Sequence, residues 1–108
     1  MKWTVETLND IVDAELEAMP AAMLARFHYI SGLIEEFGLE HVREPHVKHL
    51  RGSLWEMRMK GRDGISRALY VTAVRRRVVV VRVFIKKTQK TPSREIDVAL
   101  KRAREIRQ

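Results

Sequence analysis

Apolar residues recur at helical spacing through the first forty positions of the chain. They form two stripes, Leu8, Ile11, Val12, Leu16 and Met19, followed by Met23, Phe27, Ile30, Ile34 and Phe37. Steps of three, four and seven residues are typical of a helix with one buried face. Asn9 or Asp10 is suited to cap the first helix, Pro20 separates the two helices, and Gly38 ends the second. Two helices joined at a proline predict an antiparallel helical hairpin.

A period of two replaces the helical spacing in the middle of the chain. It predicts strands at 54–59, 65–74 and 78–85, connected by turns at 61–64 and 75–77. Strict alternation assigns one face of the last strand to Val79, Val81, Val83 and Ile85. Three consecutive strands with short turns are expected to form an antiparallel meander.

The segments on either side of the meander have less regular patterns. Trp3 and Val5 predict a short strand, whereas residues 39–53 lack a clear period and are expected to form a loop. Near the other end, Thr91 is expected to cap a last helix that Pro92 opens. Its apolar stripe consists of Ile96, Ala99, Leu100, Ala103 and Ile106.

These elements predict a single α+β domain over residues 1–108, in which the N-terminal helical hairpin packs on one face of a small antiparallel sheet. The second face of the sheet is then expected to be open. Because side chains alternate along a strand, the open face would collect five charged residues: Glu56, Arg58, Arg67, Arg82 and Lys86.

Charge is distributed unevenly along the chain, whose net charge is +7. Residues 1–40 contain eight acidic and two basic residues, whereas residues 41–108 contain six acidic and nineteen basic residues. Such segregation favours a polyanion as partner, with nucleic acid first, and an anionic membrane surface or acidic protein second. The chain has no cysteine, no apolar run long enough to span a membrane and no signal-peptide pattern, so a cytoplasmic location is expected.

Arginine and lysine grouped on one sheet face are suited to bind phosphate, and they would also stabilise the charge of a phosphorane transition state. Some of these residues have a simpler explanation. Arg58 is placed to pair with Glu56, and the arginines of 75–77 suit a solvated turn. His41, His46 and His49 lie close together in sequence, but without a shared register they do not predict a metal site.

Several segments of the chain resemble the RelE/ParE toxin superfamily, and the HigB-like, phage-derived branch in particular. They are HVKHLRG, LWEMR, ISRALY, VVVVRVFIKKTQKTP and EIDVALKRA, and FIKKTQKTP is the most specific. The resemblance implies a RelE-like fold and a toxin of a type II toxin–antitoxin pair. It further implies ribosome-dependent cleavage of mRNA without a metal or other cofactor. The implied partners are the ribosome, mRNA and a cognate antitoxin of helix-turn-helix type, which would provide the contact with operator DNA; no membrane partner is implied.

The resemblance also implies roles for individual residues. Arg67 corresponds to a strand arginine that faces the scissile phosphate, Arg58 to a basic residue on the preceding strand, and Lys86 and Lys87 to a basic segment after the last strand. The basic residues expected to bind RNA are Lys48, Arg51, Lys60, Arg82 and Lys90.

The chain departs from the family pattern at two points. Glu56 stands where some ribonuclease members have lysine, and the last helix has no tyrosine to carry a proton. His46 and His49 are the possible substitutes for that tyrosine. Because the superfamily also contains gyrase poisons and inactive members, two alternatives stay open: a non-enzymatic toxin of ParE type that acts on DNA gyrase, and a member that binds nucleic acid or antitoxin without catalysis.

Overall fold

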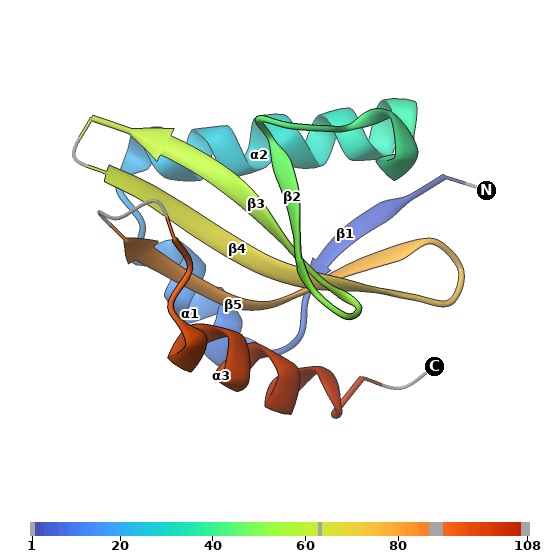
Figure 1. Cartoon of the computed structure of the whole chain (residues 1–108). Helices are drawn as coiled ribbons and strands as arrows, with labels where there is room; N and C mark the ends of the chain where they lie inside the picture. Colours follow the sequence, from blue (N-terminus) through green and yellow to red (C-terminus); the bar gives the residue numbers. More distant parts are fainter. Residues whose placement is uncertain (1, 63, 87–89, 107–108) are drawn as a thin grey trace.

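A computed structural model describes residues 2–62, 64–86 and 90–106, and Figure 1 shows its three helices and five strands. The strands are β1 (Thr4–Thr7), β2 (Val47–Arg51), β3 (Leu54–Gly61), β4 (Gly64–Ala73) and β5 (Arg77–Lys86). The helices are α1 (Asp10–Glu17), α2 (Ala21–Phe37) and α3 (Ser93–Ala103), with a short 3-10 turn at Leu39–His41. None of the helices in the described ranges is long and apolar enough to cross a membrane. The α+β class and the three predicted strands of the meander are confirmed.

The strands form one sheet in the order β1-β5-β4-β3-β2. Strands β2 to β5 are antiparallel, but β1 runs parallel to β5, with Val5 opposite Val78. The expectation of a purely antiparallel sheet was therefore wrong, although the short strand predicted around Trp3 and Val5 is confirmed. The backbone N–H of Val5 at this edge donates to Glu35 of α2 at 3.2 Å, so a helix side chain occupies part of the edge.

Strand β2 lies at the opposite edge of the sheet, inside the segment that was expected to be a loop. Its Lys48 and His49 are both exposed, and only Val47 is buried. A strand that borders solvent on both faces need not alternate polar and apolar residues, so its sequence carried no period. The prediction of a loop was wrong for 47–51 for this reason, whereas 42–46 contains no helix or strand.

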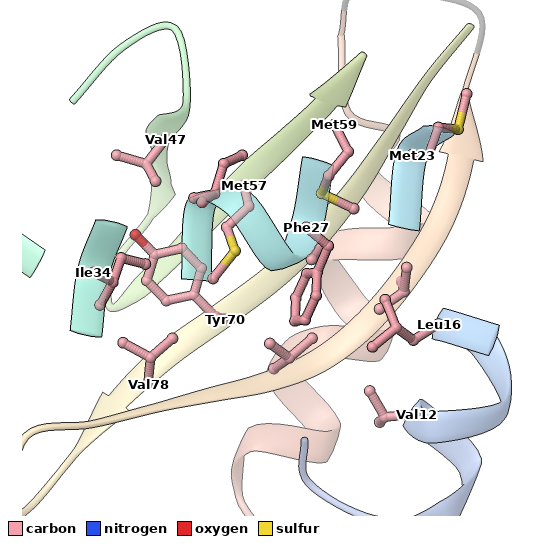
Figure 2. Packing of buried hydrophobic residues seen from close by; sticks show 14 of the residues in the cluster. Val12, Leu16, Met23, Phe27, Ile34, Val47, Met57, Met59, Tyr70 and Val78 are labelled. Carbon is pink, nitrogen blue, oxygen red and sulfur yellow. The ribbon is translucent and has the colours of Figure 1, made fainter. Parts of the chain in front are cut away.

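Helices α1 and α2 cover one face of the sheet and share an apolar cluster with it. Figure 2 shows Val12 and Leu16 of α1, and Phe27 and Ile34 of α2, around side chains of the sheet that include Tyr70. The predicted stripes are confirmed except at Ile11 and Phe37, which are 60% and 57% exposed. The Val12 N–H donates to Asn9 at 3.1 Å as the expected cap. An antiparallel helical hairpin is not confirmed, because α1 packs mainly on β5 whereas α2 lies along β3 and β1.

The second face of the sheet is not open. Helix α3 lies across it, and buried Ile96 and Ala99 pack with an apolar cluster from β3, β4 and β5. That cluster contains Leu54, Leu69, Val71, Val79, Val81 and Phe84. The predicted open face was wrong because alternation along a single strand does not reveal what an amphipathic C-terminal helix covers.

A bulge in β5 also changes which residues share a face. Leu69 pairs with Arg82 whereas the next residue, Tyr70, pairs with Val80, so Val81 is an extra residue on this strand. Consequently Val81 packs on the α3 side while Val83 packs on the α2 side. The prediction that Val79, Val81, Val83 and Ile85 share one face was wrong, since one inserted residue reverses the alternation.

Candidate nucleic-acid groove

A polar groove lies where β2 and β3 meet the chain that enters α3. It is a hollow of about 340 Å³, and its basic lining residues are Lys48, Arg51, Arg58 and Lys90. Three of these are exposed, and the Arg58 side chain is 21% exposed. The structure thus brings together one residue from the predicted catalytic set and three from the predicted RNA-binding set.

Two oppositely charged side chains are buried at this groove. Glu56 on β3 is 1% exposed, and Arg67, its neighbour on β4, is completely buried. One carboxylate oxygen of Glu56 lies 3.0 Å from Arg58 Nε, and the other lies 4.0 Å from Arg67 Nη1. The predicted pairing of Arg58 with Glu56 is confirmed. Because Glu56 serves both arginines, the three side chains together carry a formal charge of +1.

Thr91 connects the entrance of α3 to this buried group. Its hydroxyl accepts a hydrogen bond from Arg67 Nη1 at 2.7 Å and donates one to Glu56 Oε1. The prediction that Thr91 caps the last helix was wrong: the helix begins at Ser93 and its N-terminus has no side-chain cap. The hydroxyl is engaged by the two buried charges instead. Sequence reasoning missed this role because a threonine before a proline has the form of a helix start.

Burial affects the protonation equilibrium of Arg67. Desolvation by burial lowers the pKa of its guanidinium, the nearby Glu56 carboxylate raises this pKa, and the positive charge of Arg58 lowers it. In this arrangement Arg67 has no surface that could contact a phosphate. Its predicted catalytic role therefore stays a prediction, and direct contact with RNA would require a rearrangement that exposes Arg67.

Arg82 does not belong to the groove. Its guanidinium is 2.6 Å from Glu15 of α1 and 2.8 Å from Glu95 of α3, and hydrogen bonding to Glu95 is the main cause that raises its pKa. Glu15 also pairs with Arg102 and accepts the N–H of Val83. The predicted placement of Arg82 on an open face was wrong, because α1 and α3 each supply a carboxylate that neutralises it.

The two candidate proton carriers lie in different environments. The His49 ring lines the groove, has its centroid 5.0 Å from the Trp55 ring, and places Nε2 2.7 Å from the Gly52 carbonyl oxygen. A carbonyl oxygen only accepts, so Nε2 carries a proton in this contact, and in the neutral form of the ring Nδ1 is then the acceptor. His46 instead packs against Tyr29 of α2, with ring centroids 6.0 Å apart, and lines a different hollow. Of the two histidines, only His49 lines the groove together with its basic side chains.

Two further predicted basic residues, Lys60 and Lys86, lie outside the groove. Both residues pair with Ile65, one on each side of β4. Lys87 falls outside the described residues. Within residues 2–62, 64–86 and 90–106, no group of three or more His, Asp or Glu side chains is arranged to hold a metal ion.

Comparison with known proteins gives a family and a fold. The model of the family described as "Phage derived protein Gp49-like (DUF891)" matches residues 14–104. No match was found among curated proteins. Among solved structures, the chain is similar to the crystal structure of the archaeal RelE–RelB complex from Pyrococcus horikoshii OT3. The TM-score is 0.58 at 20% identity, over 83% of this chain and 100% of the other, which establishes a likeness of fold.

The family match covers most of the chain, including β2 to β5, α3 and every residue that lines the groove. The solved structure agrees with the RelE-like architecture that the sequence resemblance implied. The fold is similar to that of the archaeal RelE–RelB structure, and the chain belongs to the phage-derived Gp49-like family, in agreement with the phage-derived branch that its sequence resembled.

Proposed function

We propose that the chain is the toxin of a type II toxin–antitoxin pair and that it cleaves mRNA on the ribosome without a metal ion. The observation that carries the proposal is the groove in which Lys48, Arg51, Arg58 and Lys90 converge around a single carboxylate, Glu56, which is already paired with Arg58. A site with this surplus of positive charge favours the phosphates of a nucleic acid.

Chemistry at the groove follows from the needs of RNA cleavage. The 2′-hydroxyl of one nucleotide attacks the adjacent phosphorus, the bond to the 5′-oxygen of the next nucleotide breaks, and a 2′,3′-cyclic phosphate and a 5′-hydroxyl result. The pentavalent transition state carries extra negative charge, which a guanidinium or ammonium group stabilises. We assign this role to Arg58 and Lys90, and the binding of flanking phosphates to Lys48 and Arg51, because all four line the groove.

Proton transfer requires a group that releases and accepts a proton near neutral pH. We assign the general base to His49, whose Nδ1 is the acceptor nitrogen and would take the proton of the attacking 2′-hydroxyl. The ribosome or the RNA would supply the proton that the 5′-oxygen requires. Lys60, Lys86 and Lys87 would contact the RNA chain beyond the cleavage point, and Arg67 would act from beneath the groove.

An antitoxin partner is part of the same proposal. The similar archaeal structure is a RelE–RelB complex by its title. We expect a cognate antitoxin, of helix-turn-helix type in this branch, to bind this chain and to provide the only contact with operator DNA.

The proposal is tested by mapping new 5′-hydroxyl RNA ends across the transcriptome after a brief pulse of expression. The parent chain is compared with Arg58→Ala and with Arg26→Ala, a matched control on the exposed surface of α2. We expect new ends within translated frames for the parent and the control, and their loss in Arg58→Ala. Growth arrest in which the mRNA stays intact but the DNA is broken would overturn the proposal in favour of a gyrase poison. No growth defect at all would favour a binding protein without catalysis.

A further inference from the structure

The buried contacts beneath the groove form a continuous chain of four side chains. Arg67 donates to the Thr91 hydroxyl, Thr91 donates to one oxygen of Glu56, and the other oxygen of Glu56 lies 3.0 Å from Arg58 Nε. Glu56, Thr91 and Arg58 all line the groove, but Arg58, at the end of this chain, is the member of the four whose side chain is substantially exposed, at 21%. The other three are buried.

We infer that Glu56 and Thr91 are positioning residues for Arg58, and that Arg67 acts through them rather than by touching RNA. This inference rests on the proposed function, because it assigns to Arg58 the contact with the reacting phosphate. Neither Glu56 nor Thr91 would meet the substrate, and both would determine where the Arg58 guanidinium stands.

The geometry of Glu56 supports this role. A carboxylate held by one partner is able to rotate about its last bond, and a guanidinium paired with it would follow that motion. Here both carboxylate oxygens are engaged, one by the Thr91 hydroxyl and one by Arg58 Nε. These two contacts restrict the rotation of the carboxylate, and the ion pair at 3.0 Å holds the Arg58 guanidinium beside it.

The location of Thr91 adds a second consequence. It lies between Lys90, a basic lining residue, and Pro92, which precedes α3. Its bonds to β3 and β4 side chains therefore hold the entrance of α3 against the sheet, so that Lys90 stays in the lining of the groove that it shares with Arg58. One hydroxyl thus sets the positions of two cations from different elements.

A buried ion group of this kind is weak evidence for stability, because well-packed apolar residues in its place are often as stable or more so. A role in orienting the Arg58 guanidinium explains the buried ion group better than a role in stability. Precise placement of a charged group is what a transition state requires, and a displacement of about 1 Å is enough to reduce a rate by roughly 100-fold.

The experiment compares Thr91→Ser, which keeps the hydroxyl, with Thr91→Val, which has the shape of threonine without it. Glu56→Gln is the third variant. Single-turnover cleavage of ribosome-bound mRNA at several toxin concentrations separates the maximal rate from the half-saturating concentration. A ¹⁵N NMR signal from Arg58 Nε–H, identified by its loss in Arg58→Lys, reports the environment of the guanidinium without RNA.

We expect Thr91→Ser to match the parent within about twofold, and Thr91→Val to lower the maximal rate by roughly 10- to 100-fold with little change in half-saturation. The Arg58 signal should move in Thr91→Val and Glu56→Gln and stay in place in Thr91→Ser. Glu56→Gln removes a negative charge from the groove. Its cleavage reaction should therefore saturate at a toxin concentration equal to or lower than that of the parent, and yet its maximal rate should be lower.

Two results would overturn the inference. One is an Arg58 signal that is unchanged in both Thr91→Val and Glu56→Gln. The other is faster cleavage with tighter saturation in Thr91→Val, which would mean that Thr91 shields Arg67 from RNA. A parent chain that leaves mRNA intact, with Arg58 signals that still depend on the Thr91 hydroxyl, would overturn the proposed function and leave the positioning of Arg58 standing.

Discussion

The two faces of the sheet are both covered by helices, but they are buried in different ways. On the α2 side the largest completely buried residues are apolar or neutral, such as Met57, Met59 and Tyr70. On the α3 side, Arg67 and Glu56 are buried to a similar extent, next to apolar residues such as Leu69. Both faces come from the same strands, residue by residue in alternation, so the difference lies in what covers them.

The covering elements explain the contrast. Helix α2 is 17 residues long and runs along β3, whereas α3 has 11 residues and begins only at Ser93. The α2 side is therefore closed by side chains at helical spacing, and its stability comes from removal of apolar area from water. The end of the α3 side is closed by the chain around Thr91, where a hydroxyl and ionic contacts replace apolar packing. One face thus supports the fold, and the other combines support with a charged groove.

The largest effect that separates the two kinds of burial is expected from Glu56→Ala. This substitution leaves the guanidinium of Arg67 buried without its carboxylate, and removal of one partner from a buried ion pair costs about 3–5 kcal/mol. The free energy of unfolding, measured by urea denaturation monitored by circular dichroism, should fall by that amount.

A matched variant sharpens this prediction. The triple substitution Glu56→Leu, Arg67→Met and Thr91→Val replaces the buried group with apolar side chains of similar size. We expect it to recover most or all of the lost stability and to have no cleavage activity. Recovered stability with full activity would show that the buried charges serve neither orientation nor catalysis.

The same contrast decides what the sequence was able to predict. The α2 stripe from Met23 to Ile34 and the alternation of β3 and β4 were predicted correctly because one buried apolar face leaves a periodic pattern. Arg67, Arg58 and Glu56 were also grouped on one face correctly, since register depends only on the strand. Lys48, Arg51 and Lys90 were named from the resemblance, and the structure brings them to the groove beside Arg58.

The errors have physical reasons of another kind. The bulge at Val81 and the parallel pairing of β1 depend on contacts between distant segments, which no local pattern records. Thr91 and Arg82 were misplaced because their partners come from other elements: Glu56 of β3 for the first, and Glu15 and Glu95 of two helices for the second. A polar residue with a remote partner has the same sequence signature as a solvated one.

A smaller effect should distinguish the neutral burial of the α2 side. Burial raises the pKa of Tyr70 well above its ordinary value. Above about pH 10 an unfolded chain loses this proton while the folded chain keeps it, so stability that is present below that pH is lost as the pH rises. For one group the slope approaches about 1.4 kcal/mol per pH unit.

Tyr29→Phe isolates this signal, because the chain has two tyrosines. In that variant the tyrosinate absorbance near 295 nm should appear only together with unfolding. A second measurement compares the alkaline slope of stability with that of Tyr70→Phe, in which this contribution should be absent. Absorbance that rises while circular dichroism stays native would mean that Tyr70 is reached by solvent in the folded state.

The smallest effect concerns the rim of the groove, where the two faces differ in charge rather than in packing. Arg51 lies 3.9 Å from Asp97, with side chains 55% and 72% exposed, and such a pair contributes little to stability, about 0–1 kcal/mol. Asp97→Asn should leave the unfolding midpoint unchanged. The substitution also removes the negative charge that pairs with Arg51. At low salt, cleavage by this variant should therefore reach half-saturation at about half the toxin concentration that the parent requires. This gain in affinity should disappear at high salt, where exposed charges are screened.

Glu36→Gln is the matched control. It makes the same charge change on the exposed surface of α2 and should not alter the half-saturating toxin concentration. Equal effects of the two substitutions would mean that RNA responds to the net charge of the whole chain, and the contrast between the faces would then carry no information about where RNA binds.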